Sequence, residues 1–160
     1  MPNIPRARAA ALDETDRAIV RALLADARTA NNALAERVGI APSTCLARVR
    51  ALRERGVIRG YHAEVDLRAA GLPLQAMISV RLRAHTREQN GSFRAAAPHL
   101  PGVLAVFHMA GSEDYLLHVA VADPEALRCF VVDHLTTHPA VAQTRTNLVF
   151  ERIPGVTPVI

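Results

Sequence analysis

The sequence predicts an α+β protein of two small domains, a helical domain followed by a mixed domain in the order strand, helix, strand, strand, helix, strand. Apolar residues recur at helical spacing through residues 13–55, and they alternate with polar residues in several later segments. Glycine or proline separates most of these segments. The chain has 160 residues, of which 50% are hydrophobic and 21% charged, enough for two small cores and typical of a folded protein.

Two short helices are predicted at the start of the chain. Asp13, with Asp16 three positions later, can cap a helix that runs to about Arg28. Its apolar face consists of Ile19, Val20, Leu23, Leu24 and Ala27. A second helix carries Leu34, Ala35 and Val38, and Gly39 ends it because glycine readily takes the left-handed backbone conformation that reverses the chain.

A third helix is predicted from Pro42 to about Arg55, and Gly56 ends it. Cys45, Val49 and Leu52 share one face, which we expect to pack against the first two helices. Two helices joined by the tight turn at residues 40–42 form a helix-turn-helix unit. We therefore expect a winged-helix-like domain over residues 12–60.

The opposite face of the third helix has the residue types that contact duplex DNA. Small Ala47 and Ala51 let the backbone approach base edges, and Ser43 and Thr44 can hydrogen-bond bases or phosphates. Arg50 can bind the O6 and N7 atoms of guanine. Arg53 is placed to contact phosphate. Arg48 lies beside the buried face, so two roles stay open: a phosphate contact, or a structural bond to an acid of the first helix. Alternatively, the three helices are a plain bundle with a solvated basic face.

The distribution of charge favours the DNA interpretation. The net charge is +4, all 19 basic residues are arginine, and residues 1–60 hold 11 of them against 6 acids. Residues 61–160 hold 8 arginines and 9 acids. A basic first third predicts double-stranded DNA as the partner rather than a membrane. Residues 1–11 resemble a basic arm and not a signal peptide, and prolines and histidines interrupt the longest uncharged run, so we expect a cytoplasmic protein.

The second domain is predicted from alternating polar and apolar residues. Residues 61–67 alternate as a connecting strand, and a linker to residue 73 follows. Residues 74–160 then give strands near 74–83, 103–109, 115–121 and 141–152, with helices near 87–100 and after Asp123. This order predicts a ferredoxin-like βαββαβ domain, an antiparallel sheet with both helices on one face.

The other face of that sheet needs cover, and we expect a second copy of the chain to provide it, so that the chain dimerises through this domain. The pattern of polar and apolar residues leaves open which side chains that face presents; the ambiguous positions are Met77, Ser79, His108, Thr144 and Thr146.

The whole chain resembles the Lrp/AsnC, or feast/famine, family of prokaryotic transcriptional regulators. The residues that carry the resemblance are the segments 12–17, 34–39, 42–49 with 52 and 56–58, and 110–117. The resemblance implies sequence-specific DNA binding, dimers that assemble into tetramers or octamers, and a small effector, an amino acid, bound where dimers meet. One departure is that Ala30 and Ala41 stand where the family commonly has serine. Those helix caps must come from Asn31 or Asn32 and from Ser43, or be absent.

In the family the Gly-x-x-Asp-Tyr hairpin belongs to the effector site. Backbone N–H groups near Gly111 can bind a carboxylate, and Asp114 can pair with an α-ammonium. The candidate effector-binding residues are Gly111, Ser112, Glu113, Asp114 and Tyr115, with Thr144 and Thr146 on the last strand. The alternative is an ordinary turn, in which glycine and aspartate are favoured by backbone geometry alone.

Two other functions compete with DNA-binding regulation. An enzyme has little support, because His134 and His138 lack a third ligand in sequence and no catalytic constellation is evident; we therefore expect no cofactor and no metal. Cys45 and Cys129 are far apart and favour reduced thiols. The second rival is an architectural protein that wraps DNA without a ligand response.

Overall fold

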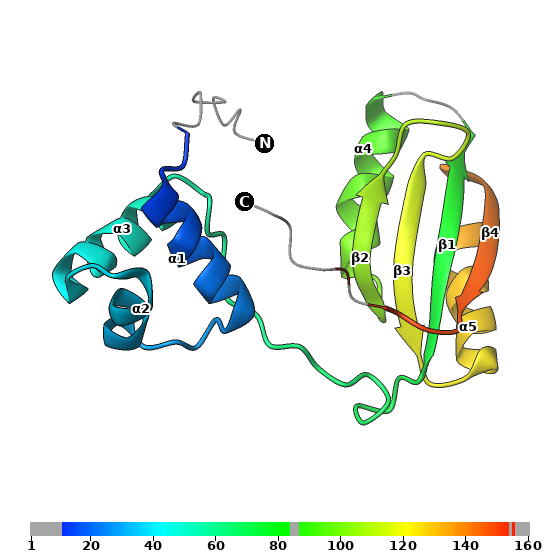
Figure 1. The fold of residues 1–160 in the computed structure, drawn as a ribbon. Coiled ribbons are helices and arrows are strands. Elements are labelled where there is room, and N and C mark those ends of the chain that lie inside the picture. The colour runs from blue at the N-terminus through cyan, green and yellow to red at the C-terminus, as the bar shows by residue number, and fades with distance from the viewer. Residues whose placement is uncertain (1–10, 84–86, 154, 156–160) are drawn as a thin grey trace. The chain divides into compact units, whose positions relative to one another are not determined.

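The computed structural model describes residues 11–83, 87–153 and 155 of the chain. The expected basic arm therefore lies, except for residue 11, outside the described residues. The chain divides into two compact units between Glu64 and Val65, within the segment predicted to be a connecting strand. Figure 1 shows the three helices of the first unit and the sheet with its helices in the second. Among the described residues, none of the helices has both the length and the apolar character needed to cross a bilayer.

The first unit consists of α1 (Glu14–Ala25), α2 (Asn31–Val38) and α3 (Pro42–Glu54). The Asp13 carboxylate caps α1 by accepting a hydrogen bond from the Asp16 backbone N–H at 2.7 Å. Gly39 ends α2 with φ of +71°. The buried core comprises Ile19, Val20, Ala22, Leu23, Leu34, Ala35, Cys45 and Leu52. The three predicted helices are present, although α1 ends three residues before Arg28.

The segment that joins the units differs from its prediction. Residues 61–66 have no regular secondary structure, where alternation predicted a strand. A strand needs a neighbour to bond its N–H and C=O groups, and no described strand pairs with this segment. Turns at residues 67–71 follow, closed by a hydrogen bond from the Leu72 N–H to the Leu67 carbonyl at 2.8 Å.

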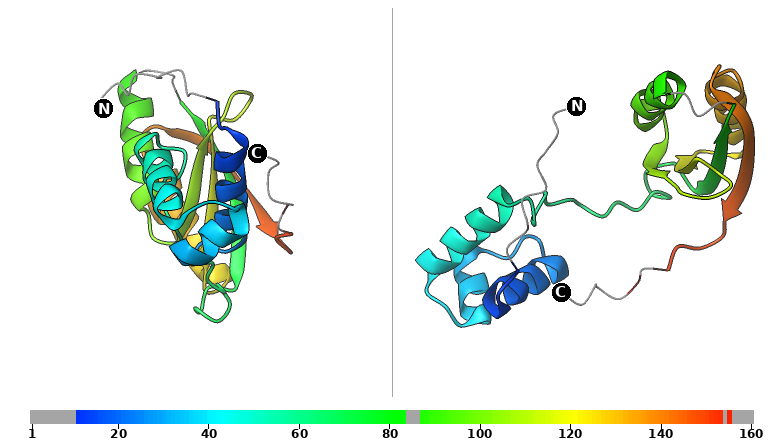
Figure 2. Two further views of the ribbon diagram at one scale, coloured as in Figure 1. Left: turned by 60° about the vertical axis from the view of Figure 1, so that its left-hand side comes forward. Right: turned by 90° about the horizontal axis from the view of Figure 1, so that it is seen from above.

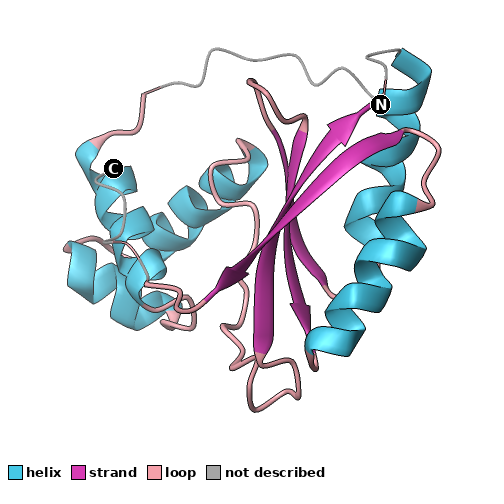
Figure 3. Ribbon diagram, turned by 90° about the vertical axis from the view of Figure 1, so that its right-hand side faces the viewer, coloured by secondary structure: helices cyan, strands magenta, loops and turns pink. Residues whose placement is uncertain are grey.

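The second unit has the predicted order of strands and helices. Its elements are β1 (Leu74–Leu82), α4 (Arg87–Ala96) with a 3-10 turn (Ala97–His99), β2 (Val103–His108), β3 (Tyr115–Val121), α5 (Pro124–Phe130) with a π-helical turn (Val131–Thr136), and β4 (Val141–Val149). The sheet is antiparallel in the order β2-β3-β1-β4. Both helices lie on one face of it (Figures 2 and 3). The fold is thus the predicted ferredoxin-like arrangement, with β4 three residues shorter than expected.

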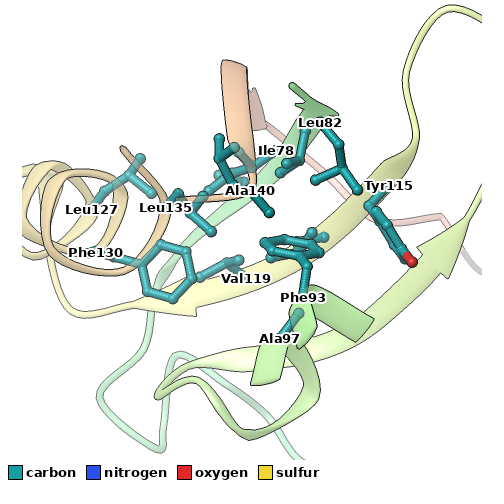
Figure 4. Close-up of a cluster of buried hydrophobic side chains, with 14 of the residues drawn as sticks. Ile78, Leu82, Phe93, Ala97, Tyr115, Val119, Leu127, Phe130, Leu135 and Ala140 are labelled. Atoms are coloured by element: carbon teal, nitrogen blue, oxygen red, sulfur yellow. The ribbon is translucent and has the colours of Figure 1, made fainter. Parts of the chain in front are cut away.

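The strand register shows which residues face the helices. Ile78 and Val80 of β1 are fully buried and pack with Phe93, Phe130 and Leu135 from the helix layer (Figure 4). Residues directly opposite one another share a face. Thr144 and Thr146 pair with Val80 and Ile78, and His108 pairs with Tyr115, so these three belong to the helix side. Met77 and Ser79 lie on the open side.

Candidate functional site

The outer face of α3 carries the residues predicted to contact DNA. Ser43, Thr44, Ala47, Arg50 and Arg53 are all exposed, whereas Cys45 and Leu52 on the other face are fully buried. The burial of one face fixes which side chains α3 presents outward. Exposure of small and basic side chains along one helix matches the requirements of a helix that enters the major groove.

Arg48 differs from its neighbours because acids of α1 bind it. Its guanidinium donates to Asp13 Oδ2 at 2.6 Å and to Asp16 Oδ1 at 2.9 Å. Arg55, which the sequence reasoning had not linked to α1, donates to Asp16 Oδ2 at 3.2 Å. Asp16 is only 6% exposed, so this network is partly shielded from water and fixes α3 against α1. The structural bond to an acid near the first helix, one of the two roles left open for Arg48, is present.

Two members of the network, Asp13 and Arg48, have shifted pKa values. The hydrogen bond from the Asp16 backbone N–H, followed by that from Arg48, holds the pKa of Asp13 below its ordinary value. The Asp13 and Asp16 carboxylates raise the pKa of Arg48 in turn. The charged forms of the acid and the base are therefore both favoured in the folded unit.

Neither α2 nor α3 has a side-chain N-cap. Ala30 and Ala41 occupy the cap positions, and no side chain bonds the free N–H groups there. The amide of Asn31 instead donates to the Pro42 carbonyl at 2.9 Å, which ties the start of α2 to the start of α3. Of the possibilities considered for these caps, absence is the one observed.

The predicted effector hairpin joins β2 to β3. The Met109 N–H donates to the Asp114 carbonyl at 2.9 Å, and Gly111 has φ of +142°, a conformation that glycine tolerates. The Asp114 carboxylate accepts a hydrogen bond from the Leu82 backbone N–H at 2.8 Å. That bond lies where the β1–β4 register shifts between Arg81 and Leu82, so Asp114 also secures the end of β1. Gly111 and Ser112 are exposed, and Glu113 and Asp114 are half-buried.

Tyr115 is a buried residue of the sheet core. Its side chain is 1% exposed, its ring lies against Phe93 and is stacked on His108, and burial raises its pKa. The hydroxyl points away from the core and donates to the Asn90 Oδ1 atom of α4 (Figure 4). Asn90 and His108 thus flank the hairpin, and no sequence motif marked either of them.

The last strand brings the two candidate threonines near this end of the sheet. Val80 pairs with Tyr115 on one side and with Thr144 on the other. Thr144 therefore lies in the same row as Tyr115, two strands away, or about 10 Å. Thr144 is half-buried, whereas Thr146 is exposed and lies one pair farther from the hairpin.

The two histidines considered as metal ligands take part in packing. His138 lies edge-on to Phe93 and accepts a hydrogen bond from the Ala140 N–H at 3.2 Å, and His134 is tilted against Phe130. No cluster of three or more metal-ligating side chains occurs in the part of the chain that the structure describes.

Each of the two units matches a known family of protein domains. Residues 12–59 match the model of a winged helix-turn-helix DNA-binding domain, and residues 75–157 match that of the Lrp/AsnC ligand-binding domain. The HTH-type transcriptional regulator AldR of Mycolicibacterium smegmatis is 51% identical over 98% of this chain and 92% of its own. The leucine-responsive regulatory protein of Rhizobium meliloti is 37% identical over 89% of this chain and 91% of its own.

A solved structure extends the likeness to three dimensions. A transcriptional regulator from Neisseria meningitidis in complex with L-Met has a TM-score of 0.85 and 35% identity, over 92% of this chain and 95% of its own. These relatives are transcriptional regulators, which sets the enzyme interpretation aside. With a DNA-binding domain, a ligand-binding domain and relatives of this identity along nearly its whole length, the chain belongs to the Lrp/AsnC family of transcriptional regulators.

Proposed function

We propose that this regulator binds specific duplex sites through α3, and that an amino acid bound at the β2–β3 hairpin modulates its assembly or its affinity for DNA. The proposal of DNA binding is supported by the outer face of α3, where Ser43, Thr44 and Ala47 are exposed together. A dimer would place two such helices in successive major grooves, about one helical turn apart. Acting on DNA, the protein would work in the cytoplasm.

The hairpin supports an amino acid as the effector class. An α-amino acid offers a carboxylate to the exposed backbone at Gly111 and Ser112, and an ammonium group to Asp114. The leucine-responsive relatives, and the relative in complex with L-Met, support the same class. Tyr115 contributes indirectly, since its buried ring and its bond to Asn90 position the hairpin.

The proposed function also requires the chain to self-associate. Phe107 on the open face of the sheet is 50% exposed in the single chain, and a second copy would bury it. We infer a dimer formed through this face, and further assembly to a tetramer or an octamer that brings hairpins of different dimers together. An effector bound between dimers would then shift the assembly equilibrium by its differential affinity for the two states.

The test is a screen of the twenty amino acids against the full-length protein. Sedimentation velocity reports the assembly, and fluorescence anisotropy reports affinity for a duplex selected in vitro from a random pool. We expect at least one amino acid to change both quantities. A flat response to all twenty, with DNA binding intact, would instead support the architectural alternative, in which the oligomer wraps DNA without a ligand.

A further inference from the structure

The arginines of the first unit fall into two groups according to their partners. Arg17 and Arg21 pair with Glu14, and Arg48 and Arg55 pair with Asp16. In contrast, no ion pair to a described residue is present for Arg50, Arg53, Arg59, Arg28 and Arg37. The acids of α1 thus neutralise two of the four arginines in the segment 48–55 and leave Arg50 and Arg53 available to an external anion.

Three of the unpaired arginines line one concavity. Its volume is about 400 Å³, and Arg50, Arg53, Glu54, Ile58 and Arg59 form its wall. The side chains of Arg50, Arg53 and Arg59 are exposed there, and Glu54 is the single acid in the lining. Three positive charges and one negative charge give this concavity a positive electrostatic potential.

The end of α3 explains how Arg59 joins residues of the helix. Gly56 has φ of +70°, and the N–H groups of Val57 and Ile58 both donate to the Leu52 carbonyl, at 2.9 and 3.2 Å. This turn folds Val57 and Ile58 back onto the core, where they pack against the buried cluster. Arg59 follows directly and therefore lies beside the last turn of α3.

We propose that Arg50, Arg53 and Arg59 together bind one backbone phosphate of duplex DNA. This inference rests on the proposed DNA-binding function and assigns a subsite within it. Guanidinium groups suit a phosphodiester because their planar N–H donors match its two unesterified oxygens. The subsite changes the role expected for Arg50, since a side chain that shares a phosphate with Arg53 and Arg59 does not bind guanine.

The subsite also divides α3 along its length. In helix-turn-helix proteins the N-terminal residues of the recognition helix contact base edges. Ser43, Thr44 and Ala47 lie in that half of α3, whereas Arg50 and Arg53 lie in the half nearer its C-terminus. Base contacts would then come from the first half, and the phosphate held at the other end would set the position of the helix in the groove.

The number of phosphates provides a sharp test. The salt dependence of affinity counts neutralised phosphates, with a slope of about −0.9 per phosphate for duplex DNA. If three arginines share one phosphate, the triple variant Arg50→Ala, Arg53→Ala, Arg59→Ala loses about one unit of slope in total. If each holds a phosphate of its own, the triple variant loses about three units.

The experiment measures the affinity of the full-length protein for a selected duplex and for a random duplex over a range of salt. We expect each single variant to lose about tenfold in affinity on both duplexes, and Glu54→Gln to gain affinity on both. Arg28→Ala is the matched control, an exposed and unpaired arginine outside the concavity, and it should change affinity little. Circular dichroism checks that every variant folds.

Three other outcomes would contradict the proposed phosphate subsite. A loss for Arg50→Ala on the selected duplex alone would identify Arg50 as a base contact. A loss of about three slope units in the triple variant would show three separate phosphates, and unchanged affinity in all three single variants would remove the subsite altogether. Failure of the unaltered protein to bind either duplex is a different result, because it rejects the proposed DNA-binding function itself.

Discussion

Asp114 has a structural contact within the sheet and is also a proposed effector-binding residue. Its carboxylate bonds the Leu82 N–H at the irregular end of β1, a contact that no sequence pattern revealed. The sequence marked Asp114 only through the Gly-x-x-Asp-Tyr spacing. We therefore expect a substitution at this position to have two effects, which must be separated before any loss of effector response is interpreted.

A pair of variants separates them. Asp114→Asn keeps an oxygen that can accept from the Leu82 N–H but removes the negative charge, so it should lose the amino-acid response with little change in stability. Asp114→Ala should lose the response and also about 1–2 kcal/mol of unfolding free energy, because the Leu82 N–H is left without that acceptor. Urea unfolding and amino-acid-dependent DNA binding measure the two effects. Retention of the response in both variants would exclude Asp114 from the effector site.

At the scale of single elements, the cap of α1 links the stability of the first unit to pH. The pKa of Asp13 is depressed in the folded chain, so its contribution is present above the unfolded value of about 4 and is lost as pH falls through the folded value. Asp13→Asn keeps a capping oxygen but does not titrate and loses the ion pair with Arg48.

We therefore expect Asp13→Asn to be less stable than the parent at pH 7 and equal to it at the acid end, where Asp13 is protonated. Urea unfolding between pH 2 and pH 7, followed by far-ultraviolet circular dichroism, gives both curves. Parallel curves, with a constant difference at every pH, would show that the charge of Asp13 contributes nothing to folding.

Two glycines with the same φ angle test the packing of the sheet. Gly71 and Gly102 both have φ of +80°, but a Cβ at Gly71 would meet nothing within 4 Å, whereas one at Gly102 would lie 2.6 Å from the Ala120 carbonyl oxygen. Gly71→Ala should cost about 1 kcal/mol, the usual penalty for the left-handed conformation. Gly102→Ala should cost about 3 kcal/mol, since strand β3 must also move. Equal losses in thermal unfolding would contradict the close contact at Gly102.

The elements differ in how far local sequence determined them. Helices α1 and α3 were predicted because Asp13, Pro42 and Gly56 mark their ends and their apolar residues face one core. The strands of the second unit followed from alternation for the same reason. Alternation failed at residues 61–66, because a strand also requires a partner that local sequence does not specify. The π-helical turn after Phe130 likewise had no local signal.

The candidate sites show the same division. The outward residues of α3 followed from helical periodicity, since burial of Cys45 and Leu52 determines the opposite face. The bond between Arg55 and Asp16 and the meeting of Arg59 with Arg50 depend on how separate segments pack, and so does the contact of Asn90 with Tyr115. Long-range contacts of this kind have no fixed spacing in the sequence and therefore required the structure.

At the scale of the whole molecule, the proposed dimer through the open face of the sheet would determine how many α3 helices reach DNA together. Phe107 pairs with Leu116, which pairs with Ser79, so all three lie on the face away from the helices. If the proposed dimer forms through this face, Phe107→Arg should convert it to monomers by placing an unpaired charge in the interface. Affinity for the selected duplex should then fall by about 100-fold or more, because the second helix no longer binds at high effective concentration.

Val132→Arg is the control, since Val132 is 42% exposed in the helix layer, and it should leave the dimer intact. Sedimentation velocity and anisotropy at equal protein concentration compare the two variants. A dimeric Phe107→Arg protein would place the self-association surface elsewhere on the chain.

The division of the arginines into paired and unpaired groups bears on how the DNA sequence preference of the protein could be changed. Arg48 and Arg55 stabilise the unit from within, and Arg50, Arg53 and Arg59 are assigned to a phosphate that every DNA sequence offers. Neither task involves Ser43, Thr44 or Ala47, which are exposed and do not belong to the buried core of the unit. Libraries randomised at these three positions alone should therefore yield folded regulators with new operators, so that recognition can be redesigned without rebuilding the scaffold.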